Sequence, residues 1–260
     1  MATDSHCHLY DLLRYMPEAE IERRRRGVIC AASSWNTEDF LYTESLAKKA
    51  ALDHAPRILL CHAVHPQAPA AINRNPQELL SFFEQLVKEN RLNAIGETGF
   101  DLFTESLRKT QAVQEELFVV HLDYATSKAL PLVLHVRKAM HEVFAYSRQL
   151  KRVPSVIFHS WSGTLGEGQS LIKRGVNAFF SFGSSIALNH KEALRSCALL
   201  PEDRLLLETD APYQPLRGNG FSCWADLPLI LHTAAAIRLE SEEALSLAID
   251  QNFIRAYMRL

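Results

Sequence analysis

The chain contains 260 residues, of which 47% are hydrophobic and 22% are charged, a size and composition that suit one large globular domain. Its formal net charge of −2 excludes a general electrostatic attraction to polyanions. No run of about 18 apolar residues occurs, which excludes a transmembrane helix, and no basic-then-apolar segment at the N-terminus is typical of a secretion signal.

Eight short apolar segments recur along the chain and predict buried strands. They are continuous and show little alternation, as expected for parallel strands that are covered on both faces. The predicted strands are the start of the chain through Ser5, Val28–Ala32, Ile58–Val64, Ala94–Gly96, Leu132–His135, Val156–Phe158, Ala178–Phe182 and Leu205–Leu207.

Amphipathic segments between these strands predict helices. They are Glu38–Leu52, Pro76–Asn90, Gln111–Lys128, Lys138–Leu150 and Lys191–Leu199, followed by Trp224–Arg238 and Ser241–Tyr257 after the last strand. Strand ends recur roughly every 25 to 38 residues, the length of one βα unit. The alternation predicts an α/β fold, with residues 1–260 forming a single (β/α)8 barrel of the TIM type.

Metal-type ligands stand at or just after the ends of five predicted strands. The segments are Asp4-Ser5-His6-Cys7-His8, Gly96-Glu97-Thr98-Gly99-Phe100-Asp101, His135-Val136-Arg137, His159-Ser160-Trp161-Ser162-Gly163 and Glu208-Thr209-Asp210-Ala211-Pro212. A closed barrel directs its strand ends toward one mouth, whereas an open sheet of this width would keep its outer strands apart. Four histidines and two carboxylates therefore predict a metal site at the C-terminal mouth.

The first two segments contain ligands with complementary roles. His6 and His8 lie two residues apart on an extended segment, so their imidazoles face the same side, while Cys7 faces away into the protein. Glu97 carries two oxygens and is expected to bridge two ions. Gly99 allows close backbone approach, and Asp101 is expected to orient a ligand imidazole from behind.

The remaining ligands complete a hydrolytic site. His135 and His159 follow adjacent strands, and Asp210 follows the eighth strand, which neighbours the first when the barrel closes. Two divalent ions held by these groups would lower the pKa of a bound water and stabilise an in-line displacement. Asp210 is the predicted general base, because a carboxylate at this place can also take a proton from the water.

Five further residues near the strand ends are candidates for substrate contact. His65 ends the third strand and points toward the same mouth. Arg137 either grips a phosphate oxygen or caps the following helix. Trp161 either stacks on a nucleic-acid base or packs against its own loop. Ser162 and Gly163 offer backbone N–H groups at a predicted helix start, where anions bind well.

The charge run Glu22–Arg26 and the cysteines carry less functional information. The run precedes a strand, so it is expected to be a solvated helix end on the opposite face of the barrel, and a nucleic-acid patch is the alternative. Five cysteines without a C-x-x-C pair indicate a reduced protein of the cytoplasm or the nucleus.

In order, type and spacing these segments resemble the TatD family of metal-dependent hydrolases, whose fold is a distorted (β/α)8 barrel. The matching motifs are D-x-H-x-H-L, G-E-x-G-x-D, P-L-V-x-H-x-R-x-A, H-x-x-S-G and E-T-D-x-P, with Gln114, Phe118 and Leu122 fitting the family's helix motif. The resemblance implies that His6, His8, Glu97 and Asp210 hold one ion and that Glu97, His135 and His159 hold the second. It also implies hydrolysis of DNA phosphodiester bonds, often from the 3′ end, with Mg²⁺, Mn²⁺ or Zn²⁺.

Substrate residues depart from the family pattern, and other functions stay open. Gln67 replaces the second histidine of a family H-P-H motif, and His121 replaces a glutamine of the family's helix motif. Trp161 places a larger side chain in the wall of the expected site. The same ions could polarise a carbonyl, so an amidohydrolase or esterase, including an aminoacyl-ester deacylase, is the first alternative. A non-catalytic scaffold is the second. The predicted partner is nucleic acid, preferably single-stranded DNA ends, and protein partners are not predictable.

Overall fold

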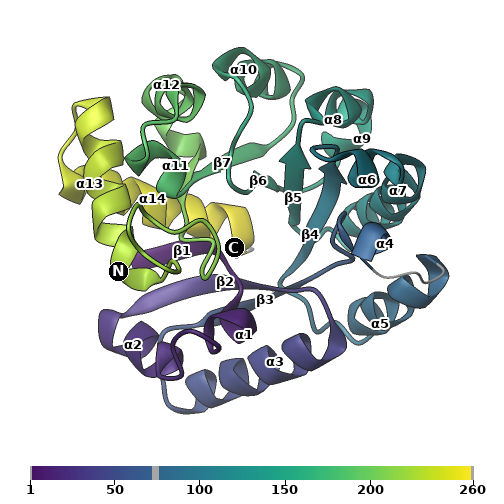
Figure 1. The fold of residues 1–260 in the computed structure, drawn as a ribbon, viewed down its shortest axis with the longest axis horizontal. Helices are drawn as coiled ribbons and strands as arrows, with labels where there is room; N and C mark the ends of the chain where they lie inside the picture. The colour runs from purple at the N-terminus through teal and green to yellow at the C-terminus, as the bar shows by residue number, and fades with distance from the viewer. Residues whose placement is uncertain (1, 72–75, 259–260) are drawn as a thin grey trace.

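The protein is a barrel of eight parallel strands surrounded by helices (Figure 1). The structure is a computed structural model that describes residues 2–71 and 76–258. The strands pair in chain order, and their bounds are β1 Ala2–Cys7, β2 Val28–Ser34, β3 Ile58–His62, β4 Ala94–Asp101, β5 Leu132–Arg137, β6 Val156–Phe158, β7 Ala178–Phe182 and β8 Leu205–Leu207. The predicted (β/α)8 fold is confirmed.

Helices follow almost every strand and pack on the outside of the barrel (Figure 1). Their bounds are α1 Leu9–Leu12, α2 Ala19–Arg26, α3 Thr37–Leu52, α4 Ala68–Ala71, α5 Pro76–Lys88, α6 Glu105–Arg108, α7 Gln111–Ser127, α8 Met140–Ala145, α9 Ser147–Leu150, α10 Leu165–Lys173, α11 Ser184–Ala187, α12 Lys191–Leu199, α13 Leu227–Arg238 and α14 Glu242–Tyr257, with 3-10 turns at Glu202–Arg204 and Trp224–Asp226. None of the helices in the described ranges is long and apolar enough to cross a membrane.

The barrel closes through the segment that follows β8. The backbone N–H of Asp210 donates to the carbonyl of His6 at 3.0 Å, and the N–H of His8 donates to the carbonyl of Ala211 at 2.7 Å. The buried carboxylate of Asp4 also accepts from the N–H and the hydroxyl of Thr209. These bonds bring the first and the last of the five ligand segments together, with Asp4 and Thr209 in contact although they lie 205 residues apart in the sequence.

Apolar side chains fill the interior of the barrel below this closure. Inward-facing residues of the strands, such as Leu59, Val133 and Phe179, form one buried cluster with Phe253 and Tyr257 of α14. The Tyr257 hydroxyl donates to the carbonyl of Ser5 at 2.6 Å. The C-terminal helix therefore supports β1 through a side chain that belongs to this cluster.

Several predicted elements have other bounds in the structure, and two of them differ most. The helix predicted over Lys138–Leu150 is two short helices, because Lys138 adopts a left-handed backbone (φ 58°) and the chain turns at Tyr146, whose hydroxyl bonds Glu115 of α7. Strand β4 runs on past the predicted end to Asp101, pairing with β5 after a register shift. A Cβ at Gly99 would lie 2.3 Å from the carbonyl oxygen of His135, so the expected close approach is confirmed.

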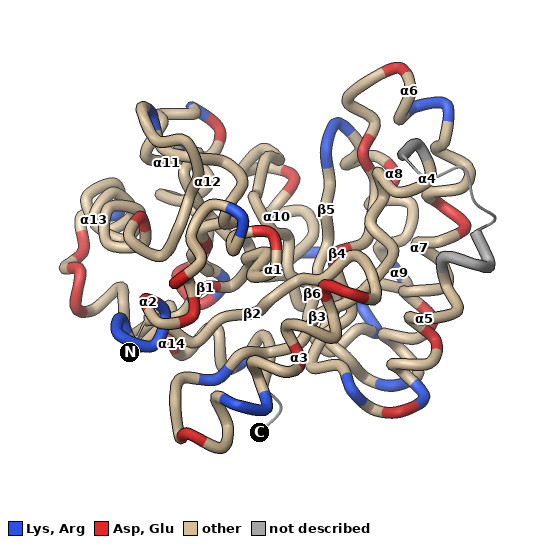
Figure 2. Tube along the Cα trace, turned by 60° about the horizontal axis from the view of Figure 1, so that its bottom comes forward, with Lys and Arg blue, Asp and Glu red and all other residues tan. Residues whose placement is uncertain are grey.

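The arginine run differs from the expected solvated helix end at one position. Arg23 is fully buried, and its guanidinium donates to the carbonyls of Val28 and Pro56 and to Glu20. The other arginines form ion pairs with Glu20, Glu22 and Asp53, so the run is not a free cationic patch. Figure 2 shows acidic and basic residues interspersed over the molecule. All five cysteines are free thiols, and Cys7 is buried as expected.

Candidate metal centre

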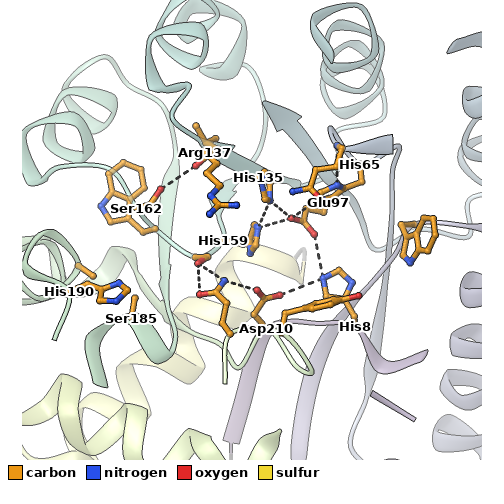
Figure 3. A pocket seen from close by; sticks show the side chains of 18 of the residues that line it. His8, His65, Glu97, His135, Arg137, His159, Ser162, Ser185, His190 and Asp210 are labelled. Carbon is orange, nitrogen blue, oxygen red and sulfur yellow. Dashed lines mark hydrogen bonds and ion pairs between the residues drawn. The ribbon is translucent and has the colours of Figure 1, made fainter. Parts of the chain in front are cut away.

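The six predicted ligands meet at the C-terminal mouth of the barrel, and Figure 3 labels all of them except His6. They come from five strands or the residues directly after them, and all are buried or nearly so. The set is His6 on β1, His8 after it, Glu97 on β4, His135 on β5, His159 after β6 and Asp210 after β8. Their donor atoms, together with one of His65, form three groups in which every atom lies within 4.8 Å of the others: His6, His8 and Glu97; His6, His159 and Asp210; and His65, Glu97 and His135.

Glu97 stands between two groups of histidines, and each of its oxygens faces one group. Oε2 lies 3.2 Å from His6 Nε2 and 3.5 Å from His8 Nε2. Oε1 lies 2.6 Å from His135 Nδ1 and 2.7 Å from His159 Nε2. This is the arrangement that a carboxylate needs to bridge two ions.

Asp210 lies beside the first group and offers it one oxygen. Its Oδ1 is 3.5 Å from His8 Nε2 and 3.8 Å from His6 Nε2, is buried, and has no hydrogen-bond partner within the described part of the chain. The other oxygen accepts from Gln214 Nε2 at 2.6 Å. Gln214 therefore fixes the Asp210 carboxylate so that its Oδ1 faces the imidazoles of His6 and His8.

The ring orientations on the other side are set by neighbours behind the site. His135 Nε2 lies 3.1 Å from Asp101 Oδ2, which leaves Nδ1 for the centre. Asp101 Oδ2 also accepts from Gln67 Nε2 at 2.7 Å. Burial by itself would raise the pKa of Asp101, but the contacts with His135 and Gln67 lower that pKa to about 2. Asp101 thus has the geometry expected of a residue that orients a ligand imidazole.

The electrostatics of the centre favour ionised carboxylates beside protonated imidazoles at His8 and His159, whereas burial lowers the pKa of His6. Burial opposes the charge on Glu97, yet the surrounding histidines lower the pKa of Glu97 well below its usual range. Burial by itself lowers the pKa of His8, but the carboxylates of Asp210 and Glu97, each with an oxygen 3.5 Å from His8 Nε2, outweigh it and raise that pKa to about 10. The pKa of His159 rises well above its ordinary value through Glu97 and Glu208, again against burial.

This donor set fits a divalent metal. Imidazole nitrogens and carboxylate oxygens are ligands for Zn²⁺ and Mn²⁺, and a bridging carboxylate suits Mg²⁺ as well. The buried Asp210 Oδ1 has no other partner in the described chain and faces the imidazoles of His6 and His8. A cation at this place would satisfy that oxygen and would replace the protons that the histidines otherwise hold.

A cavity of about 770 Å³ opens above the centre and includes some, but not all, predicted substrate residues. Arg137 lines it, and its guanidinium carbon lies 3.6 Å above the ring centre of Phe103 rather than at a helix terminus. His65 lines it too, but its Nε2 lies 3.1 Å from Glu97 Oε1, so it belongs to the second histidine group.

Trp161 packs against its own surroundings. Its side chain is 3% exposed, and its ring contacts Phe158 and Phe180 edge to face. A Cβ at Gly163 would lie 2.5 Å from this ring, which explains a glycine there. Of the two alternatives predicted for Trp161, the structure shows packing within the protein. Too little of the indole ring is exposed for a base to stack on it.

The backbone N–H groups of Ser162 and Gly163 are not at the helix start that the sequence predicted. Helix α10 begins at Leu165, and its N-cap is Thr164, which forms a capping box with Glu167. Ser162 itself is exposed beside the cavity and donates its hydroxyl to the carbonyl of Val136. The first turn of α10 is thus satisfied by protein groups, so the argument for an anion there no longer holds.

Sequence reasoning missed four residues that shape the site. Glu208 accepts from the backbone N–H of Ser160 at 2.6 Å. Gln214 and Tyr213 follow the last motif directly, and Trp35 follows β2; all three line the cavity. Their position one to four residues beyond a strand end or motif was a usable signal, but neither glutamine nor an aromatic residue suggests a ligand by itself.

Comparison with known proteins agrees with this geometry. Residues 3–258 match the family described as TatD-related DNase. A Cronobacter turicensis protein named "3′-5′ ssDNA/RNA exonuclease TatD" is 28% identical over 96% of this chain and 98% of its own length. A Mycobacterium tuberculosis "uncharacterized metal-dependent hydrolase TatD" is 29% identical over 77% of this chain and 76% of its own.

Solved structures show the same fold. The TatD homologue YjjV from Escherichia coli superposes with a TM-score of 0.84, covers 100% of this chain and 98% of its own, and is 23% identical. A TatD-family hydrolase from Entamoeba histolytica superposes with a TM-score of 0.75 at 17% identity, covering 99% of this chain and 98% of its own. The fold of the whole chain is therefore shared.

Proposed function

We propose that this chain, which belongs to the TatD-related DNase family of metal-dependent hydrolases, cleaves phosphodiester bonds of single-stranded nucleic acid from a free end. The observation that carries the proposal is the position of Glu97, whose two oxygens face two separate histidine groups. Two-ion centres of this kind are used for displacement at phosphorus. The relatives named as single-stranded DNA and RNA exonucleases support the substrate class.

Two divalent cations, Mg²⁺, Mn²⁺ or Zn²⁺, are the proposed cofactors. His6, His8, Glu97 and Asp210 would hold the first, and Glu97, His135 and His159 would hold the second. His65 would support the shared carboxylate. Bound there, the ions would supply an activated water and stabilise the charge that develops on the phosphate.

Protein groups perform the remaining steps. Asp210 Oδ1, which has no other partner in the described chain, is placed to accept the proton of the attacking water. Arg137 binds the phosphate, because it is the only lysine or arginine among the described residues that line the cavity and its guanidinium is held flat on Phe103. A planar fork held in this way matches two phosphate oxygens.

The cavity also suits a chain end better than a long duplex. A duplex-binding groove neutralises many phosphates along its length, whereas the lysines and arginines among the described residues that line this cavity amount to Arg137 alone, beside the carboxylates of Glu97, Glu192 and Asp210. The scarcity of lysine and arginine side chains would equally favour the alternative function, which is hydrolysis of a neutral ester or amide at the same metal centre. The free cysteines suit a reducing compartment, and we place the protein in the cytoplasm or the nucleus.

The test is hydrolysis by purified protein that is first stripped with a chelator and then reloaded with a single metal. End-labelled single strands, the matching duplex and an aryl ester without phosphate are the substrates. Single strands are expected to shorten from the 3′ end in a metal-dependent reaction. Turnover of the ester with no cleavage of any strand would replace this proposal with the alternative.

Arg137→Ala tests the phosphate contact. It is expected to lower kcat/KM on single strands on the order of 100-fold, the usual cost of a lost charge-stabilising donor. Arg148→Ala is the matched control, since Arg148 is exposed on α9 and does not line the cavity. Equal activity of both variants would mean that Arg137 does not contact the phosphate.

A further inference from the structure

We propose that Trp35 and Tyr213 form a nucleobase subsite, here called the aromatic subsite, at the rim of the cavity. The inference rests on the proposed nucleic-acid function and identifies the groups that bind the base beside the scissile phosphate. Both residues line the same cavity as the candidate ligands, and both are largely exposed, at 43% for Trp35 and 48% for Tyr213. A large aromatic surface left open inside a binding cavity is a surface available for stacking.

Trp35 is held on a rigid support. It directly follows β2, and its backbone N–H donates to the buried carboxylate of Asp39 at 3.1 Å. The next residue, Asn36, caps helix α3 by accepting the N–H of Asp39 at 3.0 Å. The strand end and the helix start therefore fix the backbone that carries the indole, so little ordering is needed when a base stacks on it.

Tyr213 is fixed in a similar way on the other side of His8. Its hydroxyl donates to Asp11 Oδ2 at 2.9 Å, and its ring meets the ring of His8 edge to face, with centres 5.1 Å apart. These contacts use the hydroxyl and one edge of the ring. About half of the side chain is still exposed toward the cavity.

The topology places this subsite opposite the phosphate contact. β1 lies between β2 and the segment that follows β8, so Trp35 and Tyr213 flank the β1 ligands. Arg137 belongs to β5, on the far side of the centre (Figure 3). A nucleotide with its phosphate between the centre and Arg137 would therefore direct its base toward β1 and β2, away from the buried Trp161.

This arrangement selects unpaired bases and tolerates any sequence. Stacking uses the face of a base, which every base possesses, so binding by two aromatic rings tolerates any sequence. In a duplex those faces are covered by neighbours, and extruding a base costs a few kcal/mol. Single strands, DNA or RNA, are the ligands that the aromatic subsite fits.

Intrinsic fluorescence tests the contact without catalysis. Of the three tryptophans in the chain, all within the described ranges, Trp161 and Trp224 are 3% and 1% exposed. Trp35 is thus the one that a base can reach. Adding a short oligothymidylate to chelator-treated protein should quench the emission of the wild type, and Trp35→Phe should bind the strand with similar affinity but without quenching. An unchanged quench in Trp35→Phe would overturn the proposal.

Kinetics on metal-reloaded protein test the role of the ring. The substrates are two single strands that differ only in a normal or an abasic terminal nucleotide. The wild type should prefer the normal strand by roughly 5- to 150-fold in kcat/KM, the range expected for one stacked base. Trp35→Ala should lose most of this preference, chiefly through slower cleavage of the normal strand, and Trp35→Phe should keep most of it.

Tyr15→Ala serves as the matched control, because Tyr15 is exposed but does not line the cavity. A Trp35→Ala enzyme that retains the preference for the normal strand would overturn the aromatic subsite and leave the nuclease proposal intact. A wild type that cuts neither strand would overturn the nuclease proposal, and the fluorescence titration would then decide the subsite by itself.

Discussion

Gln214 Nε2 lies 2.6 Å from Asp210 Oδ2 and 2.8 Å from the hydroxyl of Ser160. One amide therefore joins the loop after β8 to the loop after β6, each of which carries a candidate ligand. Ser160, Asp210 and Gln214 all adopt left-handed backbone conformations, with φ of 45°, 52° and 56°. Non-glycine residues in this region cost energy and gather at functional sites, so the surrounding structure holds these loops in one shape.

Removing this amide should weaken metal binding. Gln214→Met keeps the length of the side chain but frees Asp210 to rotate, and the loss in affinity is expected to be about 10- to 100-fold, as for other residues that orient metal ligands. Competition with a fluorescent chelator measures it. Gln85→Met, on the exposed face of α5, should bind metal like the wild type. Equal affinity in both variants would show that Gln214 does not orient Asp210.

Glu97→Ala should reduce activity more than His6→Ala. Glu97 reaches both histidine groups, whereas His6 contacts the group on the β1 side. Loss of Glu97 is therefore expected to release both ions, and loss of His6 to weaken one. Counting bound metal per chain by mass spectrometry, together with residual turnover, checks this, with Glu243→Ala as an exposed control. Equal metal content and equal residual rates in both site variants would contradict a bridging role.

Metal binding should release protons and strengthen as pH rises. The pKa of His8 is raised to about 10, because the nearby carboxylates of Asp210 and Glu97 outweigh the opposing effect of burial, so this imidazole is protonated at neutral pH until a cation displaces the proton. Activity should accordingly be lost on chelation and below about pH 6. Calorimetric titration of metal in buffers with different ionisation enthalpies measures the protons released. Identical heats in all buffers would contradict this linkage.

His62 should make the fold sensitive to acid. Burial lowers the pKa of His62 to about 3, whereas in the unfolded chain it titrates near the ordinary value of about 6.5. Between these values the unfolded state binds the extra proton, so the free energy of unfolding falls as pH falls, by about 1.4 kcal/mol per pH unit. From pH 6.5 to pH 5 the loss attributable to His62 is roughly 2 kcal/mol.

Replacing His62 with phenylalanine should remove that loss. The ring already packs edge to face on Phe40 and Phe82, so an apolar ring suits the site. Urea unfolding at pH 7.5 and pH 5 should show a smaller drop in stability for His62→Phe than for the wild type. The exposed His141→Phe should follow the wild type. A parallel pH dependence for His62→Phe and the wild type would mean that His62 is protonated in the fold.

The strand pattern and the candidate ligands were readable from the sequence because both are local signals. A strand buried on two faces is a continuous apolar run, and segments such as Val156–Phe158 and Leu205–Leu207 were predicted with the bounds they have. The ligands stand at the ends of such runs, and a closed barrel allows those ends only one meeting place. For this reason His6, Glu97, His135 and Asp210 could be grouped before any distance was known.

Only the tertiary structure decided how each side chain is used. Trp161 is buried and Trp35 is exposed, although both follow strands, because the first meets Phe180 of the neighbouring strand and the second meets open cavity. Arg23 is buried because its guanidinium donates to the carbonyls of Val28 and Pro56, which lie outside helix α2. Gln214 reaches Ser160, 54 residues away in the chain. Local periodicity sets which face of an element is apolar, whereas exposure and hydrogen-bond partners depend on segments that only the closed barrel brings together.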